Sequence, residues 1–234
     1  MIGVFDSGVG GLTVLRALRK ELSSADIVYF GDIANAPYGP RSNQEIVSLT
    51  AHGIKLLQDN GANHIVSACN SMSALLALSV FDTFSLAPTD LIEMVGPAVS
   101  SFRDSSARIL VVATEATIRS GVYQNALAMM GKHVQGVAIP ALAGAVEYGQ
   151  SGDTFDDIIA EALQQVNKDS YDVVLLGCTH YPLAIESFRR VLGPDVTIVD
   201  PAQAVAERAK KLFADREQGT GALLIPVGPR GCFG

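Results

Sequence analysis

The chain has 234 residues, of which 48% are hydrophobic and 18% charged, with a formal net charge of −7 and a pI near 5.0. This composition is typical of a soluble globular protein with a substantial core, and the length allows one or two domains. The acidic balance argues against a nucleic-acid or membrane-surface partner. An acidic ligand would have to be attracted by local groups, because the net charge of the protein repels it.

No targeting or membrane segment is visible. No stretch approaches the roughly 18 apolar residues of a membrane span. The N-terminal sequence MIGVFDSGVGG lacks the basic region of a signal peptide and turns glycine-rich after six residues. The three cysteines have no CxxC spacing, which argues against a secreted disulfide framework. We therefore expect a cytoplasmic protein.

Short apolar runs alternate with longer helical patterns along the chain. The predicted strands are Ile2–Phe5, Ile27–Phe30, His64–Ala68, Leu91–Val95, Arg108–Ala113, His133–Ala138, Val173–Leu176 and Thr197–Val199. The predicted helices are Gly11–Glu21, Gln44–Asp59, Glu115–Met130, Phe155–Val166, Pro182–Leu192 and Pro201–Phe213. This alternation predicts βαβ units, parallel sheets and an α/β fold.

The sequence also suggests an internal duplication. IGVFDS at residues 2–7 matches ILVVAT at 109–114, and SACNSM at 67–72 matches GCTHY at 177–181, with offsets of 107 and 109 positions. Offsets this similar favour two equivalent α/β halves, although all α/β chains are somewhat self-similar. Ligands of parallel sheets bind beyond the carboxyl ends of the strands. If two sheets face each other at those ends, Cys69 and Cys178 line one cleft.

The segment DSGVGGLT, residues 6–13, is a strand end followed by a glycine-rich turn into a helix. Its free N–H groups could bind a carboxylate or a phosphate, and the alternative is a tight turn without a ligand. No lysine follows as in a Walker A loop, and the glycine spacing does not match GxGxxG.

The two cysteine motifs have a structural and a chemical interpretation. A free cysteine often simply packs in a core. Two thiols at matched strand ends, each before a helix start, are better explained as bases or nucleophiles. Only His180 lies near either cysteine in sequence, which suits proton transfer but does not make a zinc site. We therefore predict no metal.

Other candidate residues have weaker signals. His52, His64 and His133 lie in predicted elements without polar clusters and receive no role. Cys232, in the tail GPRGCFG, is interpreted as incidental. From composition alone, Glu147 is an exposed helix residue.

Six motifs together are similar to those of bacterial glutamate racemases, in the cofactor-independent aspartate/glutamate racemase superfamily. They run in family order across almost the whole chain: GVFDSGVGGLTVLR (3–16), YFGD with APYGP (29–32 and 36–40), ACNS (68–71), ATEATIRSGVYQ (113–124), GCTHYPL (177–183) and VDPAQAVA (199–206).

The resemblance implies two similar parallel-sheet, doubly wound α/β domains with the active site in the cleft between them. We expect one domain from residues 1–95 with 200–234, and a second from 96–199. The family's catalytic thiols fall on Cys69 and Cys178, and its assisting groups on Asp6, His180 and Glu147. Implied substrate contacts are Ser7, Pro37, Tyr38, Gly39, Asn70, Ser71 and Thr179. No cofactor is implied.

Several positions depart from the family pattern. The usual threonine after Cys-Asn is Ser71, and an acidic residue usual before the next proline is Gly96. Small residues replace large apolar ones in the segment 141–145, and Ile-Ala-Asn follows Asp32 instead of Thr-Ala-Arg. These changes leave the implied chemistry intact but bear on the shape of the pocket and on the size of the substrate.

The resemblance implies a glutamate racemase that interconverts L- and D-glutamate by proton transfer between two thiols, supplying D-glutamate for peptidoglycan. The expected partner is a small acidic amino acid, and a homodimer is left open. The alternatives are an aspartate racemase of the same family and a non-catalytic α/β protein that binds an acidic metabolite. A thiol redox protein is disfavoured because the cysteines lack CxxC proximity.

Overall fold

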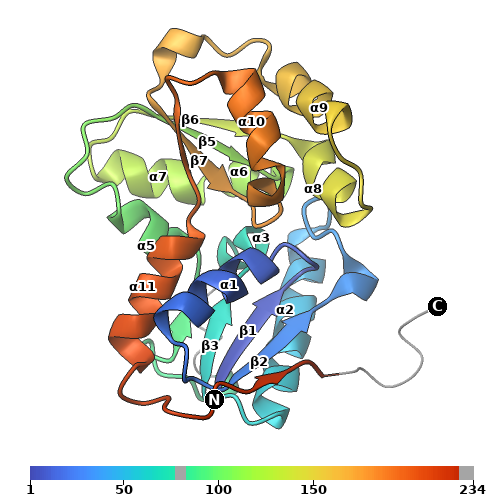
Figure 1. Cartoon of the computed structure of the whole chain (residues 1–234), viewed down its shortest axis with the longest axis vertical. Coiled ribbons are helices and arrows are strands. Elements are labelled where there is room, and N and C mark those ends of the chain that lie inside the picture. Colours follow the sequence, from blue (N-terminus) through green and yellow to red (C-terminus); the bar gives the residue numbers. More distant parts are fainter. Residues whose placement is uncertain (77–82, 227–234) are drawn as a thin grey trace.

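The computed structural model describes residues 1–76 and 83–226, so Cys232 lies outside the described residues. Within these ranges the chain forms two parallel sheets, one in each half of the molecule along its long axis (Figure 1). The first sheet has the order β4-β3-β1-β2-β9 and the second β6-β5-β7-β8. The α/β fold with two parallel sheets is therefore confirmed.

The strands of the first sheet are β1 (Ile2–Asp6), β2 (Ile27–Gly31), β3 (His64–Ser67), β4 (Leu91–Ile92) and β9 (Leu223–Leu224). Those of the second are β5 (Ile109–Ala113), β6 (Val134–Ala138), β7 (Val173–Gly177) and β8 (Thr197–Val199). The helices are α1 (Leu12–Glu21), α2 (Asn43–Asp59), α3 (Asn70–Ser73), α5 (Val95–Ser100), α6 (Glu115–Ser120), α7 (Val122–Met129), α8 (Pro140–Glu147), α9 (Asp153–Leu163), α10 (Ile185–Leu192) and α11 (Ala202–Phe213).

The two sheets share one strand order. Apart from β9, the first reads β2-β1-β3-β4 and the second β6-β5-β7-β8, so β1 corresponds to β5 and β3 to β7. The repeated sequences found at residues 2–7 and 109–114 fall on β1 and β5, and each cysteine motif follows β3 or β7. The duplicated sequence pattern is thus matched by a duplicated topology.

Helices cover both faces of the first sheet because each has an apolar stripe. Helix α1 packs against α11 on one face, where Leu18 and Phe213 are both fully buried. Helix α2 covers the other face and packs Ile54 near Phe5. A capping box starts α2: the Ser42 hydroxyl accepts from the backbone of Glu45, whose carboxylate accepts in return from the backbone of Ser42.

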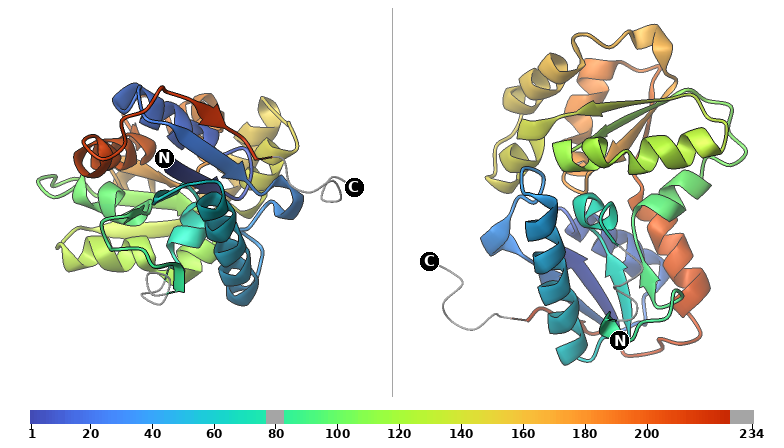
Figure 2. Two further views of the ribbon diagram at one scale, coloured as in Figure 1. Left: turned by 90° about the horizontal axis from the view of Figure 1, so that it is seen from below. Right: turned by 180° about the vertical axis from the view of Figure 1, so that it is seen from behind.

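The chain crosses between the halves twice. It leaves the first sheet after β4 and enters the second half at α5, and it returns after β8 through α11 (Figures 1 and 2). The first sheet is thus built from both ends of the described chain. The exact domain boundaries at 95/96 and 199/200 stay a prediction.

Two expected elements differ in the structure. The predicted strand Leu91–Val95 pairs only over Leu91–Ile92, because the Glu93 carboxylate accepts hydrogen bonds from the N–H groups of Val95 at 2.5 Å and Gly96 at 2.7 Å. These bonds start α5 where the strand was expected to continue. The predicted helix Glu115–Met130 is two helices, because Gly121 adopts a left-handed conformation with φ +68° and ends α6.

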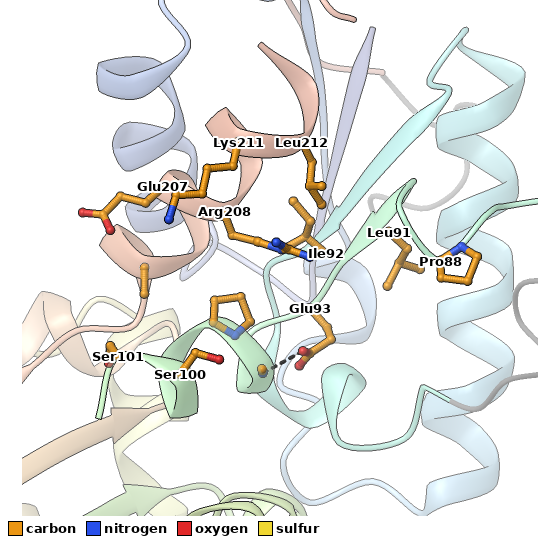
Figure 3. A pocket seen from close by; sticks show the side chains of 13 residues that line it. Pro88, Leu91, Ile92, Glu93, Ser100, Ser101, Glu207, Arg208, Lys211 and Leu212 are labelled. Atoms are coloured by element: carbon orange, nitrogen blue, oxygen red, sulfur yellow. Dashed lines mark hydrogen bonds between the residues drawn. The ribbon is translucent and has the colours of Figure 1, made fainter. Parts of the chain in front are cut away.

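A cavity of about 550 Å³ lies at the joint between the halves, lined by β4, α5 and α11 (Figure 3). Glu93, Arg208 and Lys211 are among its lining residues. None of the residues predicted to be catalytic or to bind substrate lines it.

His64 does lie in a polar cluster, contrary to the sequence analysis. It is buried at the start of β3, where Nδ1 pairs with the carboxylate of Glu217 and Nε2 lies 3.5 Å from Asp90. Arg216 pairs with Asp90 at 2.8 Å. The pattern missed this cluster because its partners are far away in sequence.

Across residues 1–76 and 83–226, no helix is both long enough and apolar enough to cross a membrane.

Candidate active site

The carboxyl ends of the two sheets meet around one small cavity. The residues that line it come after β1, β2, β3, β5 and β7 and from α8: Ser7, Pro37, Tyr38, Gly39, Cys69, Asn70, Ser71, Thr114, Ala143, Cys178, Thr179 and His180. The structure therefore brings together both cysteines, His180 and all seven predicted substrate contacts. Asp6 and Glu147 lie behind this lining and contact it through hydrogen bonds.

Cys69 approaches the cavity from the first sheet. It precedes α3, its side chain is buried, and its Sγ lies 3.6 Å from the Ser7 hydroxyl. Burial raises the pKa of Cys69 to about 12, and the nearby charge of Asp6 acts in the same direction. Cys69 is therefore a neutral thiol at physiological pH.

Cys178 approaches from the second sheet and has a different environment. Its Sγ lies 3.8 Å from Nδ1 of His180, and the opposite ring nitrogen, Nε2, lies 2.5 Å from the Glu147 carboxylate. Burial alone would lower the pKa of His180, but its hydrogen bonds to Cys178 and Glu147 raise it to about 10. A cationic imidazolium thus stands beside this sulfur, a setting that suits a thiolate.

Glu147 is the third member of this chain of contacts. Its side chain is only 5% exposed, so the compositional interpretation as an exposed helix residue is wrong. Burial would raise its pKa, but the hydrogen bonds from His180 and from the Val9 N–H hold the pKa below its usual value. Glu147 is therefore a carboxylate in contact with the imidazolium.

Asp6 ends β1 and is fully buried. Oδ2 accepts from the Gly8 N–H at 2.9 Å, and Oδ1 accepts from the Thr179 hydroxyl at 3.1 Å. Burial raises the pKa of Asp6, although the positive charge of His180 and the N–H donors of Gly11 and Gly8 oppose that rise. Because Thr179 directly follows Cys178, this hydrogen bond links Asp6 to the segment that carries the second thiol.

The glycine-rich loop does bind carboxylates, but they belong to the protein. The Gly8 N–H donates to Asp6, and the Val9 N–H donates to Glu147 at 3.1 Å. A Cβ on residue 8 would lie 2.4 Å from Glu147 Oε2, so a larger residue here would displace the Glu147 carboxylate. The amides of Gly8 and Val9 therefore donate to carboxylates of the protein itself, whereas the sequence left open either an anion site or a tight turn without a ligand.

The segment after β2 supplies one wall of the site. A cis peptide bond joins Ala36 to Pro37, and the buried Tyr38 hydroxyl donates to Asp32 Oδ2 at 2.7 Å. Asn35, where the family usually has arginine, donates to both carboxylate oxygens of Asp32, at 2.9 and 3.0 Å. The amide of Asn35 thus holds the Asp32 carboxylate that accepts from Tyr38.

Ser71 contacts the second half through a group of hydroxyls. Its Oγ lies 2.9 Å from Oγ1 of Thr114 and 3.5 Å from Oγ1 of Thr117. Neither threonine is among the residues predicted for the site, although both lie in the ATEATIRSGVYQ motif, and Thr114 directly follows β5. The sequence signal that could have identified Thr114 is its position, because it is a polar residue directly after a central strand.

The cavity between the thiols has a volume of only about 10 Å³. This space is comparable to that needed by about one water molecule, so an amino acid does not fit without movement of the surrounding elements. Hydrogen bonds from Thr179 to Asp6 and from Val9 to Glu147 join the two halves beside it. Entry of a substrate therefore requires the halves or the loops between them to separate.

Within residues 1–76 and 83–226, no group of three or more His, Cys, Asp or Glu side chains could hold a metal ion.

Several known proteins are similar to this chain in sequence and in fold. A family model described as Asp/Glu/Hydantoin racemase matches residues 2–209. The chain belongs to this racemase family. The glutamate racemase of Desulforudis audaxviator (strain MP104C) is 39% identical to it over 213 residues, which cover 89% of this chain and 77% of that protein.

Solved structures agree with this assignment. The glutamate racemase of Francisella tularensis, crystallised with D-glutamate, superposes on this racemase with a TM-score of 0.86 and 30% identity. The match covers 98% of this chain and 89% of that one. The glutamate racemase of Bacillus anthracis gives a TM-score of 0.85 at 31% identity, over 96% of this chain and 86% of that one.

Proposed function

We propose that this racemase interconverts L- and D-glutamate by proton transfer between Cys69 and Cys178, without a cofactor. The observation that carries the proposal is that two buried cysteines, at equivalent strand ends of two equivalent sheets, line one cavity. Racemisation needs a proton removed from one face of the α-carbon and another delivered to the opposite face. Two thiols approaching from opposite sheets provide the base and the acid.

The protonation states give the reaction a starting point. Cys178, beside the imidazolium of His180, acts as the thiolate and takes the α-proton, so that the Cα–H bond breaks and an S–H bond forms. Cys69, as the neutral thiol, gives its proton to the opposite face of the carbanion. Cys178 is then a thiol and Cys69 a thiolate, which is the starting state for the other enantiomer.

His180, Glu147 and Asp6 assist without taking the α-proton themselves. Glu147 keeps His180 cationic and orients its ring toward Cys178. Asp6 is hydrogen-bonded to Thr179 and acts on the Cys69 side, where its negative charge helps to raise the pKa of the Cys69 thiol. These contacts support the assisting roles that the resemblance implies.

Stabilisation of the carbanion is the harder part of the reaction, because an α-proton is far less acidic than a thiol, whose ordinary pKa is about 8.5. The side chains of Ser7, Asn70 and Ser71 line the cavity and can donate to the substrate carboxylates. Removing one preorganised donor of this sort typically costs roughly 10²–10³ in rate. Local donors of this kind also attract an acidic substrate to an acidic protein.

The biological role follows from the product. D-glutamate is a component of peptidoglycan, and we propose that the enzyme supplies it in the cytoplasm for cell-wall synthesis. The similarity to several glutamate racemases, one of them crystallised with D-glutamate, supports this substrate.

The test is isotope exchange without added pyridoxal phosphate. The protein is incubated in D₂O with L-glutamate and, separately, with L-aspartate, and optical activity and α-deuteration are followed together. We expect loss of optical activity with glutamate, accompanied by deuterium at the α-carbon. If neither glutamate nor aspartate loses optical activity or gains deuterium, the racemase proposal is overturned. If aspartate alone is turned over, the choice of glutamate is overturned.

A further inference from the structure

The amide of Asn70 has one end paired and the other end free. The hydroxyl of Tyr123 donates to Oδ1 of Asn70 at 2.5 Å. Nδ2 of the same amide is buried and has no hydrogen-bond partner among the described residues. Asn70 is 2% exposed and lines the cavity between the thiols. A buried donor without a partner is costly unless a ligand satisfies it, so this atom indicates a binding contact.

Tyr123 reaches Asn70 from the opposite half of the molecule. It lies on α7, which follows β5 and α6, whereas Asn70 begins α3 after β3. Tyr123 is fully buried, and a Cβ on Gly177 would lie 3.4 Å from its ring, so the ring packs beside the residue that precedes Cys178. The hydrogen bond therefore joins the two sides of the site.

The orientation of the amide follows from the hydrogen bonds available to the phenol. Burial raises the pKa of Tyr123 well above its ordinary value, so the hydroxyl keeps its proton. Among residues 1–76 and 83–226, its only acceptor is Asn70 Oδ1. The reversed amide would leave the phenol proton without an acceptor and turn a carbonyl oxygen toward the place where an anionic substrate binds.

We propose that Tyr123 is a positioning residue that holds the Asn70 amide so that Nδ2 donates to a carboxylate of the substrate. The proposal rests on the proposed function, because it assumes an acidic amino acid in this cavity. Since the bond spans the two halves, the donor is set in its binding orientation only when the halves come together. Closure of the site and capture of the carboxylate are thereby coupled.

The experiment compares Tyr123→Phe with Tyr181→Phe. Tyr181 is equally buried, and its hydroxyl donates to the backbone carbonyl of Ile139 at 2.9 Å, so both variants lose one buried phenol hydrogen bond. We expect Tyr123→Phe to raise KM for glutamate roughly tenfold, with kcat changed less than about threefold, because a binding contact is lost. Tyr181→Phe should lower the melting temperature similarly and leave KM unchanged. An unchanged KM in Tyr123→Phe would overturn the proposal.

A double-mutant cycle tests whether Tyr123 acts through Asn70. In an Asn70→Ala background, Tyr123→Phe should have no further effect on KM, because the positioned amide is already gone. The same fold-change in both backgrounds would overturn the proposal, since Tyr123 would then act by another route.

Asn70→Asp tests the orientation without changing Tyr123. It puts an oxygen in place of Nδ2 at nearly constant size, and we expect glutamate to bind worse than in Asn70→Ala, because like charges then meet. Binding as in the wild type would overturn the assigned orientation. The proposed function fails separately, if the wild type does not racemise glutamate. In that case calorimetric binding of D-glutamate to the same variants still decides the role of Tyr123.

Discussion

The Glu147 carboxylate lies 2.5 Å from Nε2 of His180, and the other nitrogen of that ring faces Cys178. Hydrogen bonds to Cys178 and to the Glu147 carboxylate raise the pKa of His180 to about 10, against the effect of burial. His180 is therefore cationic below about pH 10 and loses its charge above it. We therefore expect kcat/KM to fall at alkaline pH as His180 loses its proton.

Glu147→Gln should lower the pKa of His180, because the amide keeps a hydrogen bond but removes the opposite charge. We expect the alkaline limb of kcat/KM to move to lower pH by about one unit. The measurement is the pH dependence of kcat/KM for the variant and the wild type. Asp156→Asn, which removes the charge of a partly exposed carboxylate paired with Arg190, is the matched control and should leave the limb in place. An unshifted limb in Glu147→Gln would show that Glu147 does not maintain the cation.

Cys69→Ser and Cys178→Ser should each lower racemisation by roughly 10³-fold or more, because a serine hydroxyl is a far weaker acid than a thiol and its anion is not populated at neutral pH. Cys232→Ser is the control and should retain full activity. In D₂O, Cys69→Ser should still exchange the α-proton of one enantiomer, since Cys178 remains available as the base. Near-normal turnover of either catalytic variant would contradict the two-thiol mechanism.

Gly53→Ala should destabilise the protein although alanine favours helices. A Cβ on residue 53 would lie 2.3 Å from the buried ring of Phe5, which stacks on Phe30. Overpacking of this kind typically costs about 1–3 kcal/mol in the free energy of unfolding, more than the gain of up to about 1 kcal/mol from helix propensity. Urea denaturation measures the difference.

Gly144→Ala in α8 is the control for Gly53→Ala, because a Cβ at position 144 has room. The nearest heavy atom to its added Cβ is 3.9 Å away, on Tyr148, so only the propensity gain of about 0.5–1 kcal/mol should remain. If Gly53→Ala proved as stable as Gly144→Ala, the contact between α2 and Phe5 would be looser than the structure shows.

Glu217→Ala should destabilise the protein by about 1–3 kcal/mol, because it leaves Nδ1 of the buried His64 without its hydrogen-bond partner. The exposed pair of Glu186 with Arg189 offers the control, and Glu186→Ala should change the free energy of unfolding very little. Equal effects of the two substitutions would mean that the His64 cluster does not stabilise the fold.

The long elements could be predicted from sequence because apolar periodicity reports which face of a helix or strand is buried. The strand Ile27–Gly31 and the helix Asn43–Asp59 were found within a residue or so. Gly121 could not be identified as a helix break, because a glycine within a helical pattern is equally compatible with continuation. Short helices such as Asn70–Ser73 span too few turns to show a period.

The residues that form the site could be predicted from matched strand ends and from the resemblance. The hydrogen bonds that join them could not. Nothing in the sequence links Val9 to Glu147 or Tyr123 to Asn70, since these contacts join segments more than fifty residues apart. The occupation of the loop amides by Asp6 and Glu147 follows only from three-dimensional packing. Composition alone likewise placed Glu147 on the surface, because its burial depends on a distant loop.

Helix α11 and strand β9 belong to the first half of the molecule but are synthesised last, which affects how the chain folds during translation. All strands of the second sheet have been synthesised once residue 199 has been added, whereas the first sheet must wait for Leu223–Leu224. Until residues 202–213 have emerged, Leu18 and its neighbours on α1 lack the helix that covers them. The half that begins the polypeptide is therefore the last to be completed, and its apolar face stays uncovered, and open to chaperones, for most of translation.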